Sequence, residues 1–333
     1  MQVPLIFCHF GNSYYLRYTF ECAKLHNPNK EIILLGDEEN NQVCETLGIR
    51  HYLFDNFASG VEIEKFNRVY RLIQGTQHVH KRGGRDWVNF VFKRWFYVYN
   101  FVLAKNIRQF WHFDSDNMIM CDLNEQEKKF RDYDCTEQCN GICMNGFIAN
   151  THVAKGYIEK INEIFQREEF LASQQKEFDE IHPHYAFTEM RAYEIYKSEE
   201  KINSIKLNTI IDNESFDSCI CESHDMETEH LKSGREIKKV YLNKDGRIFC
   251  YHIPSQRMIK MNSLNLSYVP DYICEQVLHH AKKKLSVTRD MAPERASMNT
   301  LVHLRVPLKY KIKKLYLVQR LSSIKAKLTL AWS

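Results

Sequence analysis

The sequence lacks any long hydrophobic run. Hydrophobic residues make up 44% of its 333 residues and charged residues 26%, ordinary fractions for a globular protein. No stretch approaches the ~18 uninterrupted apolar residues that a membrane-spanning helix needs. The N-terminal MQVPLIFCHFGNSYY has no basic leader and too short an apolar run for a signal peptide, so we expect it to hold the first strand. One large or two closely fused domains are expected.

Paired C-x-x-C motifs are also missing. The eleven cysteines are an odd number scattered along a large chain, which indicates free thiols in a reducing, cytoplasmic compartment. Cys135, Cys139 and Cys143 are spaced four apart, as metal ligands on one helical face would be. The intervening Asn140 and Gly141 would break such a helix, so we interpret these cysteines as small buried residues.

Two glycine-rich loops are absent after the expected first strand. A dehydrogenase or a SAM-dependent methyltransferase would carry G-x-G-x-x-G there. A nucleotidyltransferase that makes sugar nucleotides would carry a Gly-rich loop containing Arg or Lys. The segment CHFGNSYYLRY has neither pattern, which argues against these three enzyme classes.

Acidic residues are missing from the end of the chain. From Arg295 onwards there are nine Lys or Arg and no Asp or Glu, so the rest of the chain holds 37 basic and 42 acidic residues. A neutral-to-acidic body argues against nucleic-acid binding. An apolar stripe at helical spacing runs through the tail at Leu317, Leu321, Ile324, Leu328 and Ala331. This basic amphipathic helix is expected either to bind an anionic membrane surface or to dock on the body.

The remaining pattern is that of an α/β protein with a mixed, mostly parallel sheet flanked by helices. Expected strands cover 5–8, 31–35, 52–54 and 109–113, and expected helices cover 14–25, 153–168 and 187–199. Phe92, Trp95, Tyr99 and Val102 recur at helical spacing before the last of these strands. The acidic stretch 212–229 resembles a disordered segment, and Asp245-Gly246 predicts a hairpin turn.

Two carboxylates interrupt the apolar run FWHFDSDNMIMCD, which spans residues 110–122. Burying them without a partner would be costly, so we expect Asp114 and Asp116 at the carboxyl end of a strand, where open α/β sheets form ligand crevices. In an extended strand the two side chains would share one face. Two carboxylate ligands on a short element suit Mg²⁺ or Mn²⁺. A D-x-D sequence is otherwise common as a solvated turn.

The segment KRWFYVYNFVLAKNIRQFWHFDSDNMIM resembles the helix and strand that precede and contain the DxD motif of GT-A glycosyltransferases. The similarity extends through the N-terminal half, including IILLGDEEN, and weakens after about residue 200. It implies a GT-A-like, Rossmann-related fold with a nucleotide-sugar-binding half over 1–122, an acceptor-binding half over 123–290 and the basic tail over 291–333. In such enzymes the metal bridges the two phosphates of the donor.

The resemblance also implies roles for individual residues. Asp116 would be the principal metal ligand, Asp114 would contact the ion's shell or the ribose, and Arg94 or Lys93 would lie near the diphosphate. Contacts with the base and ribose are implied for His9, Asn12, Tyr15 and Asp37. Asn145 and Gly146, in what we expect to be a turn, would lie beside the donor sugar. Each of these could instead be a surface, turn or capping residue.

Three further roles concern the second half. Glu189, at the expected start of a helix, would be the catalytic base of an inverting enzyme, with Glu194 a weaker candidate; acidic residues also favour helix starts for electrostatic reasons. His252 would be a third metal ligand, with Arg257 or Lys260 reaching the diphosphate. Ile253, Pro254 and Ser255 replace the glycines that retaining members carry after this histidine, which slightly favours inversion. His182 and His184 are alternative ligands.

The sequence therefore predicts a metal-dependent glycosyltransferase. It would move a sugar from a nucleotide-diphosphate sugar, a UDP-sugar foremost, to a hydroxyl of a glycan or lipid-linked precursor, as in polysaccharide biosynthesis. The enzyme would be cytoplasmic, with a possible peripheral position on the inner face of a membrane through its tail. The alternative is a non-catalytic protein that binds a glycan or a partner on a degenerate transferase fold.

Overall fold

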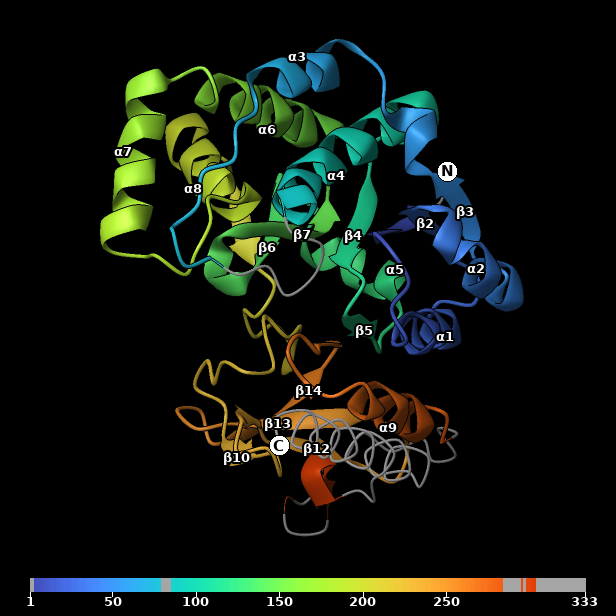
Figure 1. The fold of residues 1–333 in the computed structure, drawn as a ribbon. Helices are drawn as coiled ribbons and strands as arrows, with labels where there is room; N and C mark the ends of the chain where they lie inside the picture. Colours follow the sequence, from blue (N-terminus) through green and yellow to red (C-terminus); the bar gives the residue numbers. More distant parts are fainter. Residues whose placement is uncertain (1–2, 79–84, 284–294, 296–297, 304–333) are drawn as a thin grey trace, which may run out of the picture.

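The computed structural model describes residues 3–78, 85–283, 295 and 298–303. Within this part the chain forms two lobes (Figure 1). The first lobe contains a large sheet with helices on both faces, and the second contains a smaller sheet beside one helix. No helix among the described residues is long and apolar enough to cross a membrane. The expected basic helix of the tail lies outside the described residues.

The first lobe is built on a seven-stranded mixed sheet with the order β3-β2-β1-β4-β7-β6-β8. Its strands are β1 (Leu5–Cys8), β2 (Ile32–Gly36), β3 (Arg50–Leu53), β4 (Phe110–Asp114), β6 (Cys135–Gln138), β7 (Cys143–Ile148) and β8 (Ser204–Lys206). β7 runs antiparallel to both of its neighbours, and the other pairs are parallel. A mixed, mostly parallel sheet is therefore confirmed.

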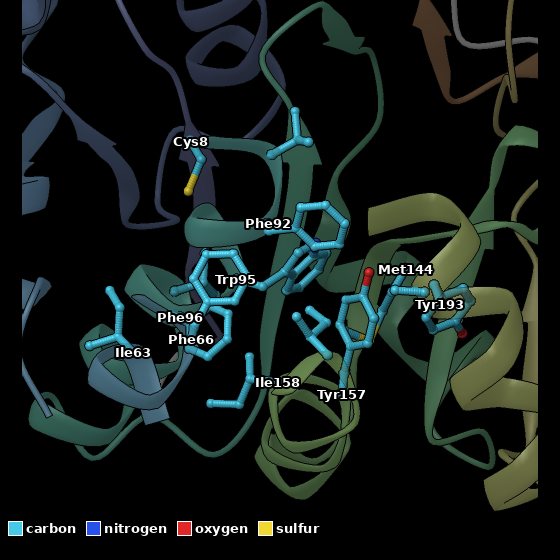
Figure 2. Packing of buried hydrophobic residues seen from close by; sticks show 14 of the residues in the cluster. Cys8, Ile63, Phe66, Phe92, Trp95, Phe96, Met144, Tyr157, Ile158 and Tyr193 are labelled. Atoms are coloured by element: carbon cyan, nitrogen blue, oxygen red, sulfur yellow. The ribbon is translucent and has the colours of Figure 1, made fainter. Parts of the chain in front are cut away.

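Helices cover both faces of this sheet because its strands alternate their apolar side chains between two cores. The helices of the lobe are α1 (Leu16–His26), α2 (Asn41–Leu47), α3 (Val61–Val69), α4 (Arg85–Ala104), α5 (Leu123–Gln126), α6 (Thr151–Ile164), α7 (Glu168–Glu180) and α8 (Glu189–Glu200). Ile6 and Cys8 of β1 face the core under α4 and α6, whereas Leu5 and Phe7 face the core under α1. Figure 2 shows the first of these cores.

α4 carries the aromatic face that its spacing predicted. Phe92, Trp95 and Val102 are buried, and Tyr99 packs half-buried against the same cluster. Trp95 meets His112 of β4 and Tyr157 of α6 edge-on, with ring centroids 4.9 and 5.4 Å apart. Figure 2 shows Trp95 and Tyr157. These contacts fix the helix over the strand that ends at the carboxylate pair.

The second lobe contains a five-stranded sheet with the order β16-β12-β13-β14-β9, packed beside α9 (Tyr272–Ala281). Its strands are β9 (Glu214–Ser215), β12 (Val240–Leu242), β13 (Ile248–His252), β14 (Arg257–Met261) and β16 (Asn299–Thr300). β10 (Thr228–His230) pairs separately with β11 (Glu236–Lys238). The expected hairpin at Asp245-Gly246 joins β12 to β13, with Gly246 in the left-handed region at φ 87°.

A short two-stranded sheet joins the lobes. β5 (Asn117–Ile119), directly after the carboxylate pair, runs antiparallel to β15 (Ser263–Asn265) of the second lobe. All six residues of this ladder are buried. The position of the turn at Ser115-Asp116 is therefore set by both lobes.

Two features differ from the sequence-based expectations. The stretch 212–229 is ordered, because Phe216 and Ile220 are buried in the cores and Asp217 forms a buried ion pair. Asn145 and Gly146 lie inside strand β7 instead of a turn, because β4 and β6 pair with it on both sides.

Candidate active site at the ends of the central strands

The carboxylate pair lies where the strand order of the large sheet reverses. β2 and β3 extend the sheet on one side of β1, and β4 extends it on the other. Connections leave the sheet in opposite directions at such a point, which opens a crevice outside the carboxyl ends of the strands. Asp114, the last residue of β4, pairs in register with Cys8, the last residue of β1. The location expected from the sequence is confirmed.

The two carboxylates have different partners. Asp114 forms an ion pair with Arg94, and Asn145 Nδ2 donates to Asp114 Oδ2 at 3.2 Å. Asp116 accepts from Ser267 Oγ at 2.8 Å and from Asn117 Nδ2 at 3.3 Å. Strand β4 ends at Asp114, so Asp116 lies in a turn and strand alternation does not set its direction.

Arg94 joins Asp114 to the expected catalytic base. The side chain of Arg94, which α4 carries, is 9% exposed and Glu189, the first residue of α8, is 5% exposed. Arg94 Nη2 donates to Glu189 Oε1 at 2.7 Å. Tyr157 Oη donates to the backbone oxygen of Glu189 at 2.5 Å, which holds the start of α8 against α6. One buried guanidinium thus lies between carboxylates from a strand end and a helix start.

The three carboxyl groups differ in acidity. Burial opposes the charge of Asp114, but Arg94 and the Asn145 amide outweigh it and lower the pKa of Asp114 below 3.8. Burial and then the charge of Asp114 raise the pKa of Asp116 to about 6. The pKa of Glu189 rises to about 7, because burial disfavours its charge more than Arg94 favours it. Asp116 and Glu189 are therefore groups that gain or lose protons near neutrality.

The donor set suits a hard divalent cation. Asp116 accepts hydrogen bonds from neutral groups, and in the described part of the chain no Lys, Arg or His forms an ion pair with it. The charge of Asp114 raises its pKa, and a cation would relieve that repulsion. No group of three His, Cys, Asp or Glu side chains among the described residues could hold a metal alone. Mg²⁺ is commonly held by one or two carboxylates together with substrate phosphates, which fits this pair.

The residues expected to contact the base and ribose lie at the neighbouring strand ends. His9 Nδ1 lies 2.8 Å from Ser115 Oγ, and the Tyr15 hydroxyl lies 3.4 Å from the same oxygen. Asp37, after β2, accepts from the backbone N–H of Gly11 at 2.5 Å and caps the turn that follows it. Asn12 is exposed in the same loop. These side chains lie beyond the carboxyl ends of β1 and β2.

Asn145 and Gly146 are buried within β7. Asn145 contacts Asp114, and its Oδ1 has no hydrogen-bond partner among the described residues. Gly146 has φ 95°, and a Cβ there would lie 2.2 Å from Thr136 Oγ1 and 2.6 Å from a Leu207 methyl. Packing inside the sheet accounts for this glycine. Asn145 remains part of the carboxylate site through Asp114.

Other candidates lie elsewhere in contacts of their own. Lys260, on β14, forms an ion pair with Glu214 at 2.8 Å. His252 ends β13, and its Nδ1 lies 2.7 Å from Ser255 Oγ within the same hairpin. His182 Nε2 lies 4.0 Å from Glu177 Oε1. The described contacts of Lys260 and His252 do not connect them to Asp114 or Asp116.

Several polar residues around the site carry no sequence signal of that role. Gln138 Nε2 donates to Asn117 Oδ1 at 2.8 Å and to the backbone oxygen of Asp217 at 2.7 Å, while Asn145 Nδ2 donates to Gln138 Oε1 at 3.1 Å. Ser267 reaches Asp116 from the second lobe. Only long-range strand pairing brings these groups together.

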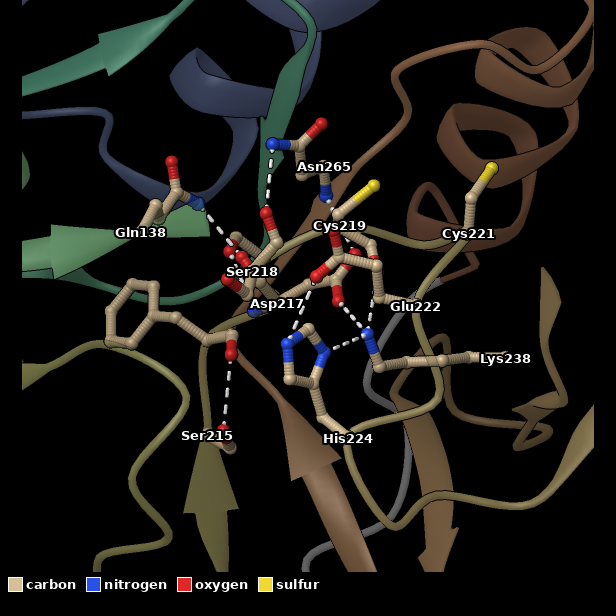
Figure 3. A network of polar contacts seen from close by, with 12 residues as sticks. Gln138, Ser215, Asp217, Ser218, Cys219, Cys221, Glu222, His224, Lys238 and Asn265 are labelled. Atoms are coloured by element: carbon tan, nitrogen blue, oxygen red, sulfur yellow. Dashed lines mark hydrogen bonds and ion pairs between the residues drawn. The ribbon is translucent and has the colours of Figure 1, made fainter. Parts of the chain in front are cut away.

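A buried ion pair supports this network from the second lobe (Figure 3). Lys238 Nζ lies 2.8 Å from Asp217 Oδ1, donates to the backbone oxygen of Cys219 at 2.5 Å and lies 3.3 Å from His224 Nδ1. The backbone N–H of Asn265 donates to Asp217 Oδ2 at 3.0 Å. The segment from Asp217 to Cys221 is thereby fixed between the two lobes.

Comparisons with known proteins give distant structural neighbours. No protein-family model matches the sequence, and no curated protein does. A cytidylyltransferase from Leptospira borgpetersenii serovar Hardjo-bovis aligns with 62% of this chain and 75% of its own, at 12% identity and a TM-score of 0.31. The glycosyltransferase GlyE of Streptococcus pneumoniae aligns over 62% and 45%, at 14% identity and 0.31. The PaToxG glycosyltransferase aligns over 60% and 70%, at 9% identity and 0.31. Neighbours this distant do not assign an activity.

Proposed function

We propose that the protein is a GT-A-like glycosyltransferase that moves a sugar from a nucleotide-diphosphate sugar to a hydroxyl acceptor. The observation that carries the proposal is the placement of Asp114 at the carboxyl end of β4, next to the end of β1, with Asp116 in the turn that follows. The strand order of the sheet reverses at this place. Crevices at such points bind nucleotides in open α/β sheets. The proposal rests on this site and on the resemblance around the DxD motif.

The nucleoside of the donor would lie on the β1 and β2 side of the crevice. His9 and Tyr15 flank Ser115 there, and Asp37 closes the end of β2. The diphosphate would then lie over Asp114 and Asp116. This order along the sheet leaves the sugar and its acceptor on the β7 and β6 side.

Asp116, with Asp114 beside it, would hold a divalent cation such as Mn²⁺ or Mg²⁺. Such an ion supplies neutralisation of the charge that develops on the leaving nucleoside diphosphate. Asp114 is kept ionised by Arg94 and Asn145. Ser267 fixes the direction of the Asp116 carboxylate through its hydroxyl. These contacts orient both carboxylates before the donor arrives.

Glu189 is the candidate acceptor of the proton from the attacking hydroxyl. Its pKa of about 7 suits a general base at neutral pH. Arg94 Nη2 donates to Glu189 Oε1 and holds this carboxylate in place. With Glu189 as a general base on the acceptor side, the proposed reaction inverts the configuration of the transferred sugar.

A second candidate function is a non-catalytic glycan- or partner-binding protein on the same fold. The burial of Glu189 favours it, because only 3% of this residue is exposed and its carboxylate is bound to Arg94. An acceptor could reach Glu189 only after α8 or Arg94 moved. Turnover of a donor separates the two functions.

The basic tail bears on the acceptor. Nine Lys or Arg and no acidic residue from Arg295 onwards would favour an anionic membrane face. We extend the proposal to a lipid-linked or membrane-associated acceptor in polysaccharide biosynthesis. Flotation with phosphatidylglycerol vesicles, compared with phosphatidylcholine vesicles, tests this part alone.

The main test is release of nucleoside diphosphate from a panel of UDP-, GDP- and dTDP-sugars with Mn²⁺ or with EDTA. Metal-dependent turnover of one donor, lost in Asp116→Asn, is the expected result. Metal-dependent UDP binding without any turnover would favour the binding protein. If the protein neither binds nor turns over any of these donors, both the proposed nucleotide-sugar donor and the proposed metal dependence are refuted.

A further inference from the structure

Tyr268 is an exposed aromatic residue directly beside the carboxylate site. It is 73% exposed, the second highest fraction among the exposed large hydrophobic side chains. Its neighbour Ser267 donates to Asp116 Oδ2 at 2.8 Å. A large aromatic ring exposed beside a polar site offers an apolar surface that a ligand can contact.

The backbone of Tyr268 is held in an unfavourable conformation. Its φ of 64° lies in the left-handed region, where a Cβ clashes with the following carbonyl oxygen. Arg235 Nη1 donates to the backbone oxygen of Tyr268 at 2.8 Å, and its guanidinium lies 5.7 Å from the ring centroid. Strain of this kind persists where surrounding contacts enforce it, and it is concentrated at functional sites. Arg235 therefore holds the backbone of Tyr268 and lies against its ring.

The segment that carries Tyr268 is linked through hydrogen bonds to the residues that follow β6. Cys221 Sγ donates to the backbone oxygen of Ser267 at 3.6 Å. The segment that carries Cys221 lies against the end of β6, where the backbone N–H of Asn140 donates to Ser218 Oγ at 3.2 Å. Burial, then the neighbouring Cys219 and Asp116, raise the pKa of the Tyr268 phenol.

We propose that the ring of Tyr268 is a stacking surface for a pyranose ring of the acceptor glycan. This inference rests on the proposed function, which puts the nucleoside on the opposite side of Asp116. The C–H face of a pyranose suits an aromatic face, and its hydroxyls would keep their contacts with water around an exposed ring. The guanidinium of Arg235 lies over one face of the Tyr268 ring, which leaves the rest of the ring for the sugar.

Binding of simple disaccharides tests the ring. Lactose, cellobiose and N,N′-diacetylchitobiose are titrated against the full chain and followed by saturation-transfer NMR. Tyr268→Ala is expected to weaken the best of them by about two- to tenfold. Tyr268→Phe keeps the ring and should bind like the wild type, whereas Tyr268→Leu keeps apolar bulk without a ring and should not. Tyr185→Ala, at a tyrosine 65% exposed between α7 and α8, is the control and should change nothing.

Unchanged binding by Tyr268→Ala, binding by Tyr268→Leu equal to the wild type, or no binding of any disaccharide by the wild type would each overturn the inference. Titration of UDP with Mn²⁺ on the same variants separates it from the proposed function. UDP affinity should be the same in all of them, because the residues proposed to contact the nucleoside are His9, Tyr15 and Asp37 and not Tyr268. If the wild type binds no UDP with Mn²⁺ but still binds a disaccharide through Tyr268, the proposed transferase function is refuted and Tyr268 remains a glycan-binding residue.

Discussion

Replacing Lys238 by Met should test how strongly the second lobe fixes the candidate site. Lys238 and Asp217 are 3% and 0% exposed, and the ammonium group has three partners at 2.5–3.3 Å. Methionine fits the volume of the lysine stem but removes the charge. It leaves the Asp217 carboxylate buried with the backbone N–H of Asn265 on its other oxygen.

Removing one partner of a buried ion pair typically costs about 3–5 kcal/mol, because the remaining charge is desolvated without compensation. Lys238→Met should lower the free energy of unfolding by about this amount. Asp217→Asn combined with Lys238→Met removes both charges, and the amide oxygen of the introduced side chain can still accept from the backbone N–H of Asn265. The double variant should therefore be more stable than Lys238→Met alone by at least about 1.5 kcal/mol.

Urea unfolding followed by tryptophan fluorescence and by circular dichroism measures both values. The pKa of His224 supplies a second readout, because burial and then Lys238 lower it in the wild type. NMR titration should show this pKa rising in Lys238→Met. A loss below about 1 kcal/mol, or a double variant as unstable as the sum of the single ones, would refute the reasoning.

Three further predictions concern the carboxylates. Asp116→Asn should weaken Mn²⁺-dependent UDP binding by on the order of 100-fold in calorimetry. Its thermal midpoint should equal or exceed that of the wild type, because burial and Asp114 disfavour the charge that the substitution removes. A lower midpoint would show that the carboxylate is structural. Ser267→Ala removes a hydrogen bond that favours ionised Asp116, so Mn²⁺ affinity at pH 7 should fall by about tenfold, and equal affinity would contradict this. The pKa of Glu189 is about 7 in the folded chain against an ordinary 4.5, so the folded state holds its proton longer and stability falls as pH rises between these values. Urea midpoints of Glu189→Gln should lack this part of the decline, and parallel pH profiles would argue against the raised pKa.

The sequence predicts well what local patterns determine. The apolar runs of β1, β2 and β4 and the aromatic face of α4 are local, and each is confirmed. Asp114 and Asp116 could be placed at a strand end because charge interrupts an apolar run there. Glu189 could be placed at a helix start from the same kind of local reasoning.

What the sequence could not predict depends on distant partners. Ser267 reaches Asp116 only because β15 pairs with β5. The acidic stretch around Asp217 resembles a disordered segment because its cation, Lys238, follows in a later strand. Asn145-Gly146 has the composition of a turn, but pairing on both sides makes it a strand. In each case, tertiary pairing overrides local composition.

The short ladder between β5 and β15 makes the candidate site depend on both lobes of the chain. A chain ending at Lys206 would retain every strand of the seven-stranded sheet, yet it would lose the ladder and the Ser267 hydroxyl that seat Asp116. The orientation of Asp116 therefore depends on residues that lie more than 140 positions later in the sequence, so neither lobe alone can supply it.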